Sequence, residues 1–122
     1  MDMQSLRGGT MTDKELLELA AKAVGFVPAF NYLPKTNALI WLAKSGTPAT
    51  WRPLLDSKEA FELSVQLQMD IVFDFDRVMV VFGDADANCI TEYFYDLPEP
   101  TDRIAATRRA IVRAAAEIGK TL

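Results

Sequence analysis

The chain has 122 residues, half of them apolar and a quarter charged, which is typical of a single ordinary globular domain. Its seven Phe, two Trp and three Tyr exclude a fully disordered chain, and no apolar stretch approaches the ~20 residues of a membrane span. The sequence has no His, so the commonest general base and the commonest zinc ligand are both missing. We therefore expect a non-catalytic domain with no cofactor, no metal and no membrane contact.

The net charge of −4 is unevenly distributed along the chain. Residues 70–102 contain nine acidic residues and one basic residue, whereas residues 103–122 contain five basic residues and one acidic residue. An acidic balance argues against nucleic-acid binding, which requires clustered Lys and Arg. The chain opens with no signal-peptide pattern, and its single cysteine, Cys89, fits a reducing compartment. We expect a cytoplasmic protein in which Cys89 is a small strand or core residue.

The first third of the chain predicts one helix and one strand. Residues 1–10 show no hydrophobic period and include two glycines, which predicts a flexible extension before a single domain over residues 11–122. Thr12 and Glu15 form a capping box for a helix over residues 13–24, with leucines on one side and Gly25 as the stop. A loop over 26–37, a strand over 38–43 and a turn over 45–50 follow.

Trp51, Arg52 and Pro53 form the most distinctive local cluster in the sequence. A Trp beside a Pro before a helix start is either an apolar plug for the helix end or an exposed anchor for recognition, and we favour the plug. The next helix is predicted over residues 57–67, where Asp56 and Glu59 repeat the capping pattern.

The acidic block predicts three strands, over residues 70–75, 78–82 and 89–95, joined by hairpins at 76–77 and 83–88. Their apolar residues do not alternate cleanly, which favours a sheet covered on both faces. A last helix is predicted over residues 102–118, capped by Thr101 and closed by Gly119. Along it, Arg109 and Arg113 are expected to point away from the apolar stripe, with Arg113 paired to Glu117.

The apolar positions of these elements define a predicted core. Truncating two of its members, Phe61 and Phe73, to Ala is expected to cost roughly 3–5 kcal/mol if both are buried. The predicted core consists of Leu16, Leu19, Leu39, Trp41, Phe61, Leu67, Ile71, Phe73, Val80, Phe82, Ile90, Phe94, Ile104, Ile111 and Ile118.

Two acidic patterns are candidates for metal chemistry. Residues 84–88 read D-x-D-x-N, the opening of a calcium loop, but such a loop requires Gly at its sixth position and Glu at its twelfth, and Cys89 and Tyr95 stand there. An acidic hairpin is the better interpretation. The carboxylates of Asp70, Asp74, Asp76 and Glu92 could converge on a divalent metal, although their spacing matches no known ligand pattern and solvated surface acids are the simpler interpretation.

The charged surfaces offer two further alternatives. An acidic surface can imitate nucleic-acid phosphate and block a basic groove on another protein. The last helix could touch phosphate through its basic residues, but these are spread around the helix. We expect them instead to offset the charge of the neighbouring acidic residues, or to stabilise the C-terminal end of the helix through its dipole. These basic residues are Arg103, Arg108, Arg109, Arg113 and Lys120.

Three stretches together carry a family resemblance: TDKELLELAAKAVG at residues 12–25, WRPLLDSKEAFELSVQL at 51–67 and RRAIVRAAAEIGK at 108–120. In this order they resemble the phage ABA-sandwich domain family, which includes NinX-like phage proteins. The chain departs from the family pattern at Arg52, where the family tends to have Asn, and at residues 57–58, where acidic and Gly residues are expected. The resemblance implies a three-layer fold with helices on both sheet faces and a phage or prophage origin; it brings no reaction and no catalytic residues.

The sequence thus predicts a single α+β domain, a three-layer α/β/α sandwich with a mostly antiparallel sheet of about four strands and three helices. The expected function is that of a non-catalytic phage or prophage accessory protein in the bacterial cytoplasm, acting on an unknown protein partner; a dimer is possible. A metal-assisted carboxylate enzyme and an acidic nucleic-acid mimic are the alternatives. The candidate contact residues are Trp51, Arg52, Asp76, Asp84 and Asp86.

Overall fold

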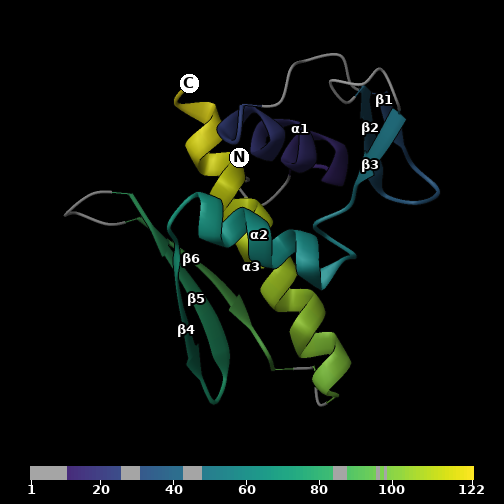
Figure 1. Cartoon of the computed structure of the whole chain (residues 1–122). Coiled ribbons are helices and arrows are strands. Elements are labelled where there is room, and N and C mark those ends of the chain that lie inside the picture. Colours follow the sequence, from purple (N-terminus) through teal and green to yellow (C-terminus); the bar gives the residue numbers. More distant parts are fainter. Residues whose placement is uncertain (1–10, 26–30, 43–47, 84–87, 96, 98) are drawn as a thin grey trace, which may run out of the picture.

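The computed structural model describes residues 11–25, 31–42, 48–83, 88–95, 97 and 99–122, with only the backbone described at positions 41, 42 and 48. These residues form three helices and six strands, and the strands make two antiparallel sheets of three (Figure 1). The predicted α+β class is confirmed. The predicted single sheet of about four strands is not confirmed, because the described strands divide between two separate sheets.

Helix α1, Asp13–Ala23, begins at the predicted capping box. The Thr12 hydroxyl accepts a hydrogen bond from the Glu15 backbone N–H at 3.1 Å, and the Glu15 carboxylate accepts one from the Thr12 N–H at 3.0 Å. The Thr12 hydroxyl also lies 3.0 Å from the Glu15 carboxylate and donates to it. The bonds that this carboxylate accepts from the Thr12 backbone and side chain hold the pKa of Glu15 below its usual value, since they favour the charged form. Leu16, Leu17 and Ala20 are on the buried side of the helix.

Strands β1 (Asn31–Leu33), β2 (Ala38–Leu42) and β3 (Pro48–Trp51) form the first sheet, with β2 in the centre. The strand predicted over 38–43 is confirmed as β2. The predicted loop before β2 and the predicted turn after it each contain a strand instead. These segments become strands because pairing with β2 satisfies their backbone N–H and C=O groups. They were not predicted because they are too short and too rich in Pro to show a strand pattern.

A polar network joins this sheet to the helices. Asn37, which has a φ of 48° in the β1–β2 turn, accepts a hydrogen bond from the Tyr32 hydroxyl at 2.6 Å. Its amide donates to Asp13 at 2.8 Å, and the second oxygen of Asp13 pairs with Arg109 of the last helix at 2.9 Å. One carboxylate at the start of α1 thus links the hairpin turn to the C-terminal helix.

Helix α2, Ser57–Gln66, is preceded by a tight turn that the sequence partly predicted. The Asp56 carboxylate accepts a hydrogen bond from the Glu59 N–H at 3.1 Å, as expected for a cap. Glu59 reaches further back than expected, to the Arg52 N–H at 2.7 Å. Arg108 of the last helix donates to the Leu54 carbonyl and the Ser57 hydroxyl, both at 2.9 Å, and so fixes this turn to the body of the fold.

Strands β4 (Asp70–Asp74), β5 (Arg77–Phe82) and β6 (Asn88–Tyr93) form the second sheet in the order β4-β5-β6. Along β5 the buried residues Val78, Val80 and Phe82 alternate with partly exposed ones, so one face of the sheet packs inward. The opposite face also carries apolar residues such as Met79, which explains the poor alternation. A third layer on that face is not confirmed, since α3 is the only described helix with more than slight contact to this sheet.

Helix α3, Pro100–Lys120, lies at the centre of the fold and contacts α1, α2 and the strands β5 and β6 (Figure 1). It begins earlier than predicted, with Pro100 in its first turn. The N-cap residue is Glu99 and not the predicted Thr101, and the Glu99 side chain makes no capping hydrogen bond. Gly119 is buried inside the helix rather than ending it. None of the described helices is long and apolar enough to cross a membrane.

The predicted core is confirmed in its centre and wrong at its edge. The members that are buried are Leu16, Leu39, Val80, Phe82, Phe94 and Ile111, and those partly buried against them are Leu19, Leu67, Ile71, Ile90 and Ile118. Phe61, Phe73 and Ile104 are exposed instead, and the side chain of Trp41 lies outside the described part. Cys89 is also exposed, at the edge strand β6, and not a core residue.

Candidate functional site

An apolar hollow of about 640 Å³ lies between α2, β4 and the first half of α3. We call it the apolar groove. Phe61 of α2 and Phe73 of β4 belong to its two walls, and the buried Ile111 and Phe94 lie at its floor. The complete lining is Ser57, Ala60, Phe61, Ile71, Phe73, Asp74, Phe94, Arg103, Ile104, Thr107, Arg108 and Ile111.

The large side chains of the apolar groove are unusually open to solvent. Phe61 is 64% exposed, Phe73 is 63% exposed and Ile104 is 48% exposed. Phe75, in the turn after β4, is 90% exposed. Because a Phe side chain offers about 200 Å² of surface, Phe61 and Phe73 together present roughly 250 Å² of exposed apolar area, to which Ile104 adds. Phe75 lies outside the lining of the groove. The largest exposed apolar patch on a monomer is a few hundred Å² and is often functional.

The local folding of α2 and β4 explains why these residues are left uncovered. The buried side of α2 consists of Ala60, Leu63 and Ser64, and the helix packs on α3. Phe61 and Val65, one turn apart, lie on its exposed side. In β4, Phe73 pairs with the buried Val78, so it points to the helix side of the sheet, but at an edge strand that α3 does not cover.

The charged groups at the rim of the apolar groove are already engaged within the chain. Asp74 lies 3.5 Å from Arg77, across the β4–β5 hairpin. Arg103 donates to the Leu97 carbonyl at 2.9 Å, and its guanidinium sits 5.2 Å from the centre of the Phe94 ring. The nearby Asp76 and Asp74 carboxylates raise the pKa of Arg77, which stays charged. The groove therefore presents an apolar surface, and the charged side chains at its rim already have partners within the chain.

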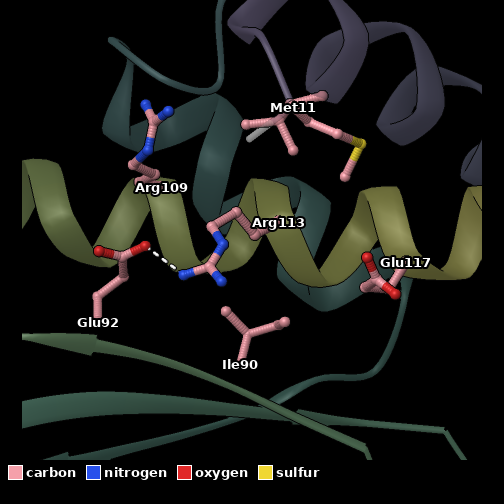
Figure 2. Close-up of a pocket in the computed structure, with 7 residues that line it drawn as sticks. Met11, Ile90, Glu92, Arg109, Arg113 and Glu117 are labelled. Atoms are coloured by element: carbon pink, nitrogen blue, oxygen red, sulfur yellow. Dashed lines mark hydrogen bonds and ion pairs between the residues drawn. The ribbon is translucent and has the colours of Figure 1, made fainter. Parts of the chain in front are cut away.

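A second, polar cleft of about 180 Å³ lies between the start of α1, β6 and α3 (Figure 2). Arg113 donates to the carboxylate of Glu92 on β6 and lies near Ile90, whereas Arg109 extends to the other side of the cleft. Arg109 is paired with Asp13, and Glu117 with Lys120 at 2.8 Å. Because each of these charges already has a partner within the chain, the cleft presents few free polar groups to a ligand, and its Arg113–Glu92 pair ties α3 to the sheet.

These pairs correct two expectations about the last helix. Arg109 and Arg113 do not point away from the fold, and Arg113 pairs with Glu92 of the sheet rather than with Glu117. A sequence spacing of four residues favoured the local partner, but packing of α3 on the sheet supplied a closer one. Arg103 and Arg108 also bond within the chain, which favours a structural role for the basic helix.

The four carboxylates considered for metal chemistry do not converge. Asp70 and Asp74 lie at opposite ends of β4, and Glu92 lies on β6 with Arg113 as its partner. In the described part of the chain, no group of three or more acidic, Cys or His side chains could hold a metal ion. The arrangement therefore lacks the three-carboxylate centre that a metal-assisted enzyme of this kind would require.

Of the five candidate contact residues, three lie in the described part of the chain. Trp51 is buried, with 7% of its surface exposed, as expected of a plug before the helix. Arg52 is exposed beside it, and Asp76 is half-buried in the β4–β5 hairpin, next to Arg77. Asp84 and Asp86 lie outside the described residues. The apolar groove was missed because Phe61 and Phe73 fit the period of a buried face, and no local signal in the sequence distinguishes an uncovered face.

Replacing Phe61 or Phe73 by Ser is expected to change the free energy of unfolding by less than about 1 kcal/mol, because both side chains are largely exposed and lose little burial. Thermal and urea unfolding of each variant, compared with the unchanged chain and with Phe75→Ser, measures this. A loss above about 3 kcal/mol in either variant would mean that the groove is closed in solution.

No family model, no curated protein and no solved structure matches this chain.

Proposed function

We propose that this chain is a non-catalytic accessory protein of phage or prophage origin that acts in the bacterial cytoplasm by binding another protein through the apolar groove. The resemblance of three sequence stretches to the phage ABA-sandwich domain family supports the origin. The exposed phenylalanines of the groove support the binding, and they are the single observation that carries it.

The chemistry of the apolar groove suits a macromolecular partner better than a reaction. Its walls are apolar, and the charged residues at its rim already contact partners within the chain. Aromatic residues in an exposed hollow are typical of binding hot spots, because burying them on association removes large apolar areas from water. A binding protein needs no histidine, no metal and no nucleophile, in keeping with the composition of the chain.

A capture experiment with groove variants tests this proposal. The unchanged chain, the double variant Phe61→Ser with Phe73→Ser, and the control Phe75→Ser are immobilised and exposed to lysates of phage-infected and lysogenic bacteria. Quantitative mass spectrometry is expected to find at least one protein retained by the unchanged chain and by the control, and lost with the double variant. If every retained protein binds all three forms equally, the groove is not the contact surface and the proposal fails.

A further inference from the structure

Strand β4 is an open edge of its sheet. It pairs with β5 over its whole length, from Asp70 opposite Val81 to Asp74 opposite Arg77. Its other side pairs with no strand of the described part. An open edge presents a row of backbone N–H and C=O groups that another extended chain can pair with. This edge adjoins the apolar groove, because Ile71 and Phe73 of β4 form one of the groove walls.

The dimensions of the helix layer indicate room for one more strand. Packed helices lie about 8–10 Å apart, whereas neighbouring strands lie about 4.8 Å apart, so each helix covers roughly two strands. Helix α3 covers β5 and β6, and α2 packs beside α3. Helix α2 makes at most slight contact with β4, and the apolar groove lies between them. By this spacing there is room under α2 for one strand beyond β4. The exposed Phe61 on α2 is therefore placed to pack on a strand that the described fold does not contain.

The residues of β4 define which side chains a strand added beside it requires. Ile71 and Phe73 point to the helix side, where they require apolar partners at alternate positions. Asp70 and Asp74 stand at the two ends of β4 and both are exposed; Asp74 also lies 3.5 Å from Arg77 of β5. Opposite-charge pairs across neighbouring strands are favourable, so a paired strand gains from Lys or Arg at its ends.

We infer that the partner contributes an extended segment that adds as a fourth strand beside β4, with apolar residues at alternate positions and basic residues at its ends. This inference rests on the proposed function and specifies the kind of partner that the apolar groove receives. The apolar side chains of the segment fill the space between Phe61 and Phe73, and its backbone completes the hydrogen bonds of the β4 edge.

Charge disfavours a second copy of this chain at the same edge. Antiparallel pairing of β4 with its own copy, centred on Val72, places Asp70 of each chain opposite Asp74 of the other. Like charges directly opposite each other destabilise a strand pair, and this arrangement contains two such pairs. The acids at the strand ends thus block self-pairing and select a basic segment.

A selection from a display library of random decapeptides tests the inference. Peptides are selected on the unchanged chain and counter-selected on the Phe61→Ser, Phe73→Ser double variant. The expected survivors alternate apolar and polar residues and carry Lys or Arg near both ends. For one such peptide, Phe73→Ser is expected to weaken binding at least about tenfold, since a buried aromatic contact is lost. Asp70→Asn is expected to weaken it about two- to fivefold, and Glu18→Gln, on α1, not at all.

The outcomes separate this inference from the proposed function. NMR contacts between the peptide backbone and β4 confirm the added strand. Survivors with apolar residues spaced three and four apart, as in a helix, overturn it and leave the proposed function standing. A selection without groove-dependent survivors, beside a lysate experiment that does capture a groove-dependent protein, overturns this inference alone. Sedimentation showing a dimer that Phe73→Ser dissociates identifies a second copy as the occupant and also overturns it.

Discussion

Replacing Gly119 by Ala is expected to destabilise the protein by about 2–3 kcal/mol, because α1 and α3 cross too closely to admit a single added carbon. A Cβ at this position would overlap the carbonyl oxygen of Leu19 and lie 2.8 Å from its carbonyl carbon. The obstacle is backbone, so relief requires a shift of one helix against the other. Ala is a better helix former than Gly by about 1 kcal/mol, and the clash is expected to outweigh that gain.

Urea and thermal unfolding of Gly119→Ala, with Lys120→Ala as the neighbouring control, measure this effect. Lys120 is exposed and its pair with Glu117 is worth little at the surface, so the control is expected to unfold within about 0.5 kcal/mol of the unchanged chain. A Gly119→Ala variant as stable as the control would show that the two helices are further apart than the structure has them.

Replacing Leu17 by Ala is expected to cost about 2–5 kcal/mol, the range observed when a fully buried leucine is truncated and a cavity is left. Leu17 has no exposed surface and lies in the core between α1 and the rest of the fold. Leu55→Ala is the matched control, because the same atoms are removed from a side chain that is 52% exposed. Its expected cost is below about 1 kcal/mol.

The comparison of the two leucine variants tests the location of the core independently of any single value. Both lose the same side-chain volume, so a difference in their unfolding midpoints reports burial and cavity formation. Equal midpoints would place α1 away from the core, and the polar network from Asp13 to Arg109 would then have no packed interface to support.

Local signals in the sequence predicted those elements whose stability is largely local. The capping box of Thr12 and Glu15 located the start of α1. The tight hairpin between β4 and β5 was also predicted, but one residue too late: the turn is Phe75–Asp76, and Arg77 already pairs with Asp74 as the first residue of β5. These features depend on residues three or four positions apart, whose side chains and backbone bond to one another in any context. The α+β class follows from the same local evidence.

Features decided by distant contacts were not predictable in the same way. Strands β1 and β3 exist because β2 pairs with them, and Gly119 looks like a helix stop until Leu19 of α1 is packed against it. The apolar groove is the clearest case, because Phe61 and Phe73 obey the periods of buried faces. Only the arrangement of whole elements shows that nothing in the described chain covers them.

The central position of α3 affects when the core can form during synthesis of the chain. The pairs that tie this helix to the rest join distant parts of the chain: Arg109 and Asp13 are 96 residues apart, and Arg108 and Leu54 are 54 apart. The helix that completes the core leaves the ribosome after every described element that it packs on. The nascent chain therefore holds these apolar faces open until α3 has emerged, a period in which chaperones have access to it.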